Sequence, residues 1–156
     1  MDDTYNVLLF LHVLLVVVWV GGAMMLQMLY GRVRRAGEPG RVAAYLSDVE
    51  FIGQRVFAPA SALVLVLGFA LVAKGDWDLG EFWILFALAG FAYSFLTGFF
   101  YTGPESGRLA EQIGEQGSDD DPEIRRRIGR LLLVARVELL IFVAIIYVMV
   151  DKPFLV

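Results

Sequence analysis

Apolar residues run in four long stretches separated by polar segments, and this pattern predicts four membrane-spanning helices. No charged residue occurs between Asp3 and Arg32, a gap longer than the roughly 20 apolar residues that cross the hydrocarbon core. Backbone groups find no water there, so each stretch is expected to be helical. Short connections favour an up-down, all-α four-helix bundle formed by the whole chain, residues 1–156. We place the spans at about 5–30, 52–73, 82–102 and 131–150.

Composition supports a membrane protein and narrows its chemistry. Of the 156 residues, 58% are hydrophobic and 19% are charged, whereas soluble domains are about 45–50% apolar and about 25% charged. The net charge of −4 argues against a nucleic-acid partner. The chain has no cysteine and one histidine, which excludes disulfides, thiolate chemistry and a two-histidine site within one chain.

The arginines predict how the protein is oriented. Segment 31–51 holds four arginines and segment 103–130 holds five, whereas the other side holds only Lys74 and Lys152. By the positive-inside rule both segments are expected to be cytoplasmic, with both termini outside. The expected location is the plasma membrane of a bacterium or archaeon.

Both cytoplasmic segments carry helix signals. Pro39 is placed to open a helix, and the apolar residues that follow recur at helical spacing up to Ile52. This predicts a helix lying at the membrane interface and leading into the second span. Asp121 is a good N-cap with Pro122 at the first helical position, so the fourth helix is expected to begin there, after a loop tip at 117–120.

His12 is the sharpest candidate for chemistry. At 100° per residue, His12, Trp19 and Leu26 share one stripe of the first helix, with Gly22 beside it. A histidine inside a membrane normally faces the bundle interior, where burial keeps it neutral and able to bind a metal. His12 is therefore a candidate ligand to haem or copper. The alternative is a structural histidine hydrogen-bonded to a neighbouring helix.

If His12 ligates a haem, the second axial position of the iron must also be accounted for. Met149, near the outer end of the fourth helix, is the methionine at a suitable depth. A five-coordinate haem and a second His12 from another copy of the chain are the other options. Methionine also fills gaps in ordinary cores, so Met149 has a structural reading too.

Three charges are expected at one depth near the cytoplasmic ends of the second and fourth spans. The expected contact pairs Glu138 with Arg55, while Arg136 points to another neighbour because it is two residues from Glu138. Such a network suits a proton relay or an anchor for an anion. It is equally explained by a structural ion pair and an arginine that reaches the headgroups.

Small residues follow one line of the third span. Gly90, Ser94, Gly98 and Thr102 recur every four residues, which makes a smooth ridge for close helix packing. Gly21 and Gly22 of the first span are the candidates for the facing groove. The same ridge would also suit a flat ring.

Four segments resemble a family of bacterial four-helix integral membrane proteins of unknown function. They are residues 10–22, Arg55 to Ser61, Gly103 to Glu105, and Leu133 to Glu138. The first segment, in which six residues separate His12 from Trp19 and Gly21 follows two residues later, is also similar to the copper-resistance protein D family and to haem-binding membrane protoporphyrinogen oxidases. The second likeness implies that His12 ligates haem; no other residue carries over.

Three functions are consistent with these features. The first is a redox or haem-linked role through His12. The second is an accessory subunit that binds another membrane protein, or a second copy, through the small-residue ridge. The third is a small transporter or proton relay that uses Arg55, Arg136 and Glu138.

Overall fold

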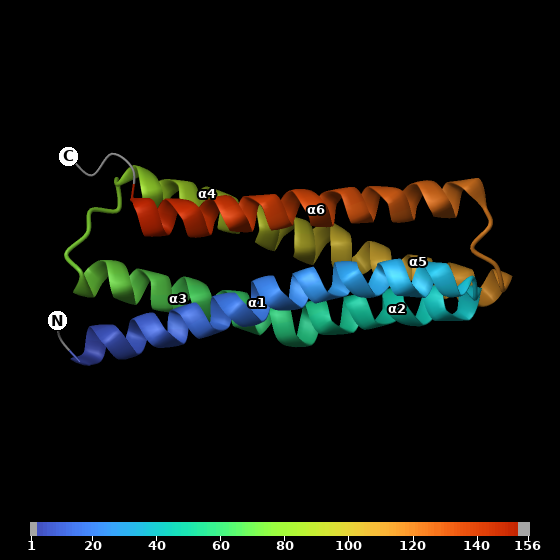
Figure 1. Cartoon of the computed structure of the whole chain (residues 1–156), viewed down its shortest axis with the longest axis horizontal. Coiled ribbons are helices and arrows are strands. Elements are labelled where there is room, and N and C mark those ends of the chain that lie inside the picture. Colours follow the sequence, from blue (N-terminus) through green and yellow to red (C-terminus); the bar gives the residue numbers. More distant parts are fainter. Residues whose placement is uncertain (1–2, 153–156) are drawn as a thin grey trace.

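The computed structural model describes residues 3–152, which are almost entirely helical. The elements are α1 (Asp3–Ala36), α2 (Pro39–Ile52), η1 (Gly53–Phe57), α3 (Ala58–Lys74), α4 (Phe82–Thr97), η2 (Gly98–Thr102), α5 (Gly103–Gln116) and α6 (Pro122–Asp151). Elements α2, η1 and α3 join end to end, as do α4, η2 and α5. The described residues therefore form four long apolar helices in an up-down bundle, with both ends of the chain at one end (Figure 1). The predicted fold class is confirmed.

The helices are longer than the spans expected from the apolar stretches. The four helices have 34, 36, 35 and 30 residues, and 34 residues at 1.5 Å each make about 50 Å, against about 30 Å of hydrocarbon. Helix α1 continues through its arginines to Ala36. One end of the bundle, which we call the α2–α5 half, therefore extends beyond the expected spans.

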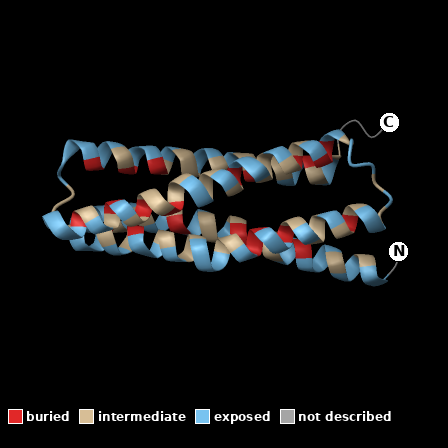
Figure 2. Ribbon diagram, turned by 180° about the vertical axis from the view of Figure 1, so that it is seen from behind, coloured by how far each residue is buried: buried red, intermediate tan, exposed pale blue. Residues whose placement is uncertain are grey.

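The α2–α5 half has its own hydrophobic core, which keeps these polar helices folded. Helix α2 packs along α5 over most of its length. The core consists of Val42, Leu46, Leu109, Ile113, Ile124, Ile128 and Leu131. Around the expected spans, large apolar side chains such as Phe10 and Leu140 are exposed instead. Buried positions are a minority along the whole ribbon (Figure 2). Lipid is the medium that suits such a surface.

The expectation that residues 39–52 lie flat at the interface is wrong. Gly53 keeps helical backbone angles, φ −55° and ψ −48°, so α2 runs straight on into the next span along the bundle axis (Figure 1). Packing against α5, which lies alongside, holds it there. The other local predictions are confirmed: residues 117–121 connect α5 to α6, and the Asp121 carboxylate accepts a hydrogen bond from the Glu123 amide at 2.8 Å.

Both long composite helices contain a five-residue π-helical turn followed by a proline. The Ala58 amide donates to the Gly53 carbonyl, and the Gly103 amide donates to the Gly98 carbonyl. A proline lies two residues after the end of η1 and of η2. Because proline has no N–H, it interrupts the i to i−4 hydrogen bonds of the α-helix, and the wider π turn accommodates this interruption. The two π turns contact each other in the middle of the bundle. Single π turns are frequent at functional sites.

The bundle consists of two helix pairs. Helix α1 packs along α3, and α4 packs along α6, while contact between α1 and α6 joins the pairs on one side. At Gly90 the second pair is especially close, because a Cβ there would lie 2.7 Å from Ile145 Cδ1.

Enlarging Gly90 is expected to loosen this contact. Gly90→Val forces the isoleucines of α6 out of place, and overpacking of this kind costs about 1–3 kcal/mol. Thermal unfolding in detergent measures the loss. Gly21→Val is the control, because a Cβ at Gly21 meets nothing within 4 Å. Equal melting temperatures for the two variants would contradict the close contact.

A mostly buried ion pair ties α5 to α6. Arg127 donates to Glu105 at 2.5 Å and to Gln112 at 2.9 Å. The hydrogen bond from Arg127 lowers the pKa of Glu105 below its ordinary 4.5. The folded state then binds protons less readily than the unfolded state, so the pair stabilises the fold above pH 4.5 and this contribution is lost as the pH falls through the lowered pKa.

Replacing Glu105 is therefore expected to weaken the protein near neutral pH and to flatten its acid sensitivity. Melting temperatures of the parent and of Glu105→Gln, recorded from pH 7 down to about 3, measure this. The two curves should approach each other at the acid end. Parallel curves over the whole range would show that the pair contributes nothing.

Candidate functional site

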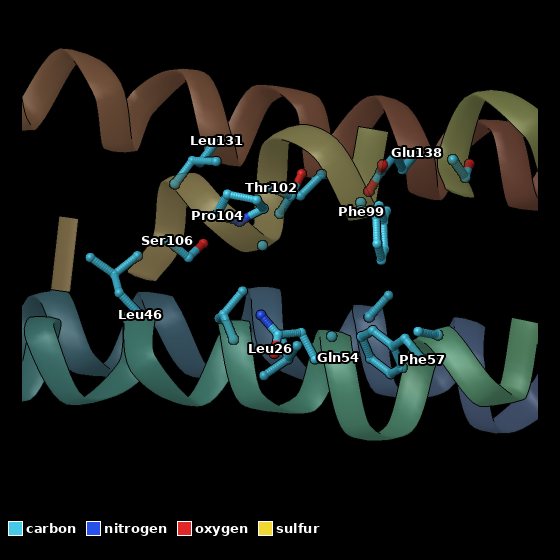
Figure 3. A pocket seen from close by; sticks show the side chains of 18 of the residues that line it. Leu26, Leu46, Gln54, Phe57, Phe99, Thr102, Pro104, Ser106, Leu131 and Glu138 are labelled. Carbon is cyan, nitrogen blue, oxygen red and sulfur yellow. The ribbon is translucent and has the colours of Figure 1, made fainter. Parts of the chain in front are cut away.

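The described residues enclose a large cavity of about 670 Å³ between the two helix pairs. Small-molecule sites commonly measure about 300–1,000 Å³. One wall comes from α1, α2, η1 and α3, and the other from α4, η2, α5 and α6 (Figure 3). Both π turns contribute to it, and a Cβ added at Gly53 or Gly98 would meet nothing within 4 Å. The proline-linked turns therefore border the open space.

Polar side chains without partners gather around this cavity. Five lining residues have a buried side-chain nitrogen or oxygen atom with no hydrogen-bond partner: Gln27, Ser94, Thr102, Ser106 and Glu138. Ser94 and Ser106 are only 4% and 1% exposed. Buried polar groups are normally paired, and leaving one unpaired costs about 1–3 kcal/mol. A group of such atoms around one space is the arrangement expected of a binding site.

The unpartnered atoms lie mainly on one wall. Thr102, Ser106 and Glu138 project from the η2, α5 and α6 side, whereas the facing wall presents Leu26 and Phe57 (Figure 3). The cavity is thus polar on one side and apolar on the other. It matches a molecule that is itself part polar and part apolar.

Two other polar residues of the lining are already satisfied. The Tyr45 hydroxyl donates to the Leu26 carbonyl at 2.9 Å, and the Ser61 hydroxyl donates to the Ala58 carbonyl at 2.9 Å. Burial raises the pKa of Tyr45 to about 12, so its hydroxyl keeps its proton and remains a donor. Neither group needs a ligand, which distinguishes them from the five unpartnered residues.

Aromatic side chains close the cavity toward the chain termini. The Trp19 ring packs edge-on against Phe142 at 4.8 Å and against Phe91 at 5.6 Å between ring centroids. Trp19 and Phe142 also line the cavity. Edge-to-face aromatic packing is rigid and dry, so the cavity ends at this cluster.

His12 is buried as expected, on the same inward stripe as Trp19 and Leu26. It does not line the cavity. Its ring lies against α3, where it meets the Val64 backbone and stands 3.4 Å from the Cβ position of Gly68. Its Nδ1 atom has no hydrogen-bond partner. Met149 lies elsewhere, packed against the cluster of Trp83, Ile84 and Val148.

These surroundings do not fit a haem between His12 and Met149. Helix α3 covers the His12 ring directly, and Met149 belongs to the α4–α6 side of the bundle. Within residues 3–152, no three His, Cys, Asp or Glu side chains gather as a metal site. Haem or copper ligation by His12 stays a prediction.

The expected intramembrane ion pair is not formed. Arg55 and Arg136 are exposed, whereas the Glu138 Oε1 atom is buried without a partner at the cavity. No ion pair between Glu138 and either arginine occurs among the described contacts. The two arginines point outward because a wide cavity, rather than a direct contact of η1 with α6, separates the helix pairs at this level.

The small-residue line divides into two parts. Gly90 packs on α6 as a ridge would, while Ser94, Gly98 and Thr102 line the cavity. Gly21 and Gly22 do not form the facing groove, because Gly22 lies against Phe57, with its Cβ position 2.7 Å from Cε1. The change falls between Gly90 and Ser94, where α4 stops packing on α6 and begins to face the cavity.

Sequence reasoning missed several residues of the lining, including Gln27, Ser106 and Phe57. Part of the signal was present in the chain. Gly53 is followed six residues later by Pro59, and Gly98 is followed six residues later by Pro104. A glycine and a proline at this spacing in two apolar helices mark the two interruptions that border the cavity.

Comparison with known proteins gives a family and no function. Residues 6–153 match the family model described as "Predicted integral membrane protein (DUF2269)". No curated protein and no solved structure matches the chain. The likeness of the first helix to copper-resistance and protoporphyrinogen oxidase families finds no support in these matches. Since the match spans nearly every residue, the chain belongs to the DUF2269 family of predicted integral membrane proteins.

Proposed function

We propose that this protein binds a neutral lipophilic molecule with oxygen-bearing polar groups in the cavity between its helix pairs. The observation that carries the proposal is the group of five unpartnered polar side chains around one 670 Å³ space. A bound molecule with carbonyl or hydroxyl oxygens would satisfy these groups and fill the apolar side with hydrocarbon.

The side chains favour a neutral polar group. The amide of Gln27 is a donor through its nitrogen, and the three hydroxyl groups donate as well as accept. The buried Glu138 Oε1 atom has no partner, and the arginine among the lining residues, Arg108 of α5, is exposed. An anion beside Glu138 would therefore be left without compensation. A carbonyl or hydroxyl group meets donors and acceptors alike.

The cavity is closed at the end nearest the chain termini, and this argues for binding rather than passage across the membrane. The Trp19 cluster ends the cavity on the side of the termini, and no continuous polar path leads past it among the lining residues. A transporter or proton relay that uses Glu138 would need a second conformation that opens this cluster. Holding or presenting a ligand needs none.

Quenching of Trp19 fluorescence tests the proposal. Trp77→Phe and Trp83→Phe leave Trp19 as the single tryptophan, and a brominated monoacylglycerol supplies a neutral lipid that quenches on contact. In lipid nanodiscs, quenching should saturate with the probe. Gly98→Leu places a side chain in the cavity and should weaken binding by about tenfold or more.

Gly21→Leu is the matched control, because Gly21 is also free of neighbours at Cβ but does not line the cavity. It should quench like the parent. Equal quenching in the parent, Gly98→Leu and Gly21→Leu would place the probe in the surrounding lipid and refute the proposal.

A haem-linked role has one supporting observation, the buried and unpartnered Nδ1 atom of His12. Haem would supply electron transfer there, and α3 would first have to move away from the ring. The absorption spectrum of protein purified from haem-replete cells tests this: a Soret band absent from His12→Ala supports it, and a colourless preparation contradicts it.

A further inference from the structure

We infer that the cavity takes its ligand sideways from the bilayer, through an opening between η1 and η2, and that the ligand is a single-chain lipid with a neutral head. This inference rests on the proposed function, since it assumes that the cavity is occupied. It adds the route and the kind of molecule.

The exposed residues of the lining show where the cavity opens. Four lining residues are exposed: Arg108 of α5, Gln54 of η1, and Phe99 (56%) and Phe100 (69%) of η2. We call the three at the π turns, Gln54, Phe99 and Phe100, the mouth. Phe99 and Phe57 point toward one another from opposite walls (Figure 3). The mouth therefore lies where the two helix pairs face each other at the π turns.

The two sides of the bundle are unequal, and this explains the opening. Contact between α1 and α6 closes one side of the bundle. On the other side the extensive contact of α2 with α5 ends at the π turns. There η1 and η2 meet only at a few points, and α3 and α4 have still less contact, although they are consecutive in the chain. An opening on this side leads outward between two membrane-spanning helices, into lipid.

The depth of the mouth matches a lipid near the headgroup boundary. The second and third spans are expected to reach that boundary close to Arg55 and Thr102, which adjoin the mouth in sequence. Arg55, next to Gln54 in the chain, is exposed, and at this boundary a long basic side chain reaches phosphates. A lipid with a small head would need little vertical movement to enter.

Chemistry then selects the part of the lipid that enters. The polar wall offers Ser94, Thr102 and Glu138 to a head with hydroxyl or carbonyl oxygens. Phe99 and Phe100 make the η2 side of the mouth aromatic and apolar, so an acyl chain can remain against it and extend into the bilayer. A single chain suits one opening between two helices better than the paired chains of a phospholipid.

Cross-linking the mouth tests the route. The chain has no cysteine, so Gln54→Cys with Phe99→Cys introduces the only two thiols, which a flexible bis-maleimide can join. In the single-tryptophan background, the rate of Trp19 quenching after addition of brominated monoacylglycerol should fall by about tenfold once the thiols are joined.

The control pair is Val56→Cys with Leu96→Cys. Both residues are exposed on the same helices but do not line the cavity, so reaction with the same reagent should leave the rate unchanged. An unchanged rate in the joined mouth variant would overturn lateral entry while leaving binding intact. Absence of saturable quenching before any cross-linking would instead mean that the proposed function fails.

The kind of ligand has its own readout. Brominated phosphatidylcholine has two chains and a charged head. It should quench Trp19 weakly, and to the same extent in the parent and in Gly98→Leu. Quenching by this phospholipid that saturates and is lost in Gly98→Leu would overturn the assignment to a single-chain neutral lipid.

Discussion

Glu138→Leu is expected to make the protein more stable and at the same time abolish ligand binding. The Glu138 Oε1 atom is buried without a partner, and an unpartnered buried polar group costs about 1–3 kcal/mol. An apolar side chain of similar size removes that cost. It also removes the polar anchor, so saturable quenching of Trp19 should disappear. Melting temperature and quenching measure the two effects on one sample.

Two control variants show whether the effects of Glu138→Leu come from the loss of its buried polar group. Glu138→Gln keeps a group that both donates and accepts hydrogen bonds, so it should retain binding to the neutral probe. Glu111→Leu changes an exposed carboxylate of α5 and should shift stability by no more than about 0.5 kcal/mol. A clear loss of stability in Glu138→Leu would indicate that the carboxyl group has a structural partner, and the site would lose its main polar element.

Trp19→Ala is expected to be the most destabilising single substitution described here. Trp19 is buried, and its ring packs on Phe91 and Phe142, so truncation should cost about 3–5 kcal/mol. Thermal unfolding in detergent measures this. The substitution also removes the closed end of the cavity, so its effect should include faster proton exchange at amides of the facing helices.

Trp77 provides the comparison for Trp19. It lies in the loop between α3 and α4, under the Lys152 ammonium at 4.1 Å from its ring centroid. The cation–π contact contributes about 0.5–1 kcal/mol, and the ring also packs edge-on against Trp83 at 5.5 Å between centroids. Because Trp77 is only partly buried, Trp77→Ala should still cost less than Trp19→Ala. Similar losses from the two would show that the Trp19 cluster is not the rigid closure proposed here.

The bundle itself could be predicted from the sequence because charge is so expensive in lipid. The gap between Asp3 and Arg32 predicts a span without reference to any neighbour. The same reasoning predicts helices that are too short, because it ends each span at the first arginine. Helix α1 continues to Ala36 because α2 and α5 build a core beyond the expected spans, and such packing depends on residues distant in sequence.

The inward stripe of α1 was also predictable, and His12, Trp19 and Leu26 are its buried members. The cavity was not. Ser94, Gly98 and Thr102 look like a packing ridge when a regular helix is assumed, and Glu138 looks like half of an ion pair. The space between the helix pairs, which no local pattern encodes, changes both interpretations.

Native mass spectrometry of the protein gently extracted from its own membrane tests the central claim most directly. The parent and Gly21→Leu should carry one lipophilic molecule per chain, and Gly98→Leu should be bare. The mass of the retained molecule would then identify the ligand class without an added probe. A parent protein that is itself bare, or the same adduct on all three proteins, would contradict the claim that this cavity is a binding site.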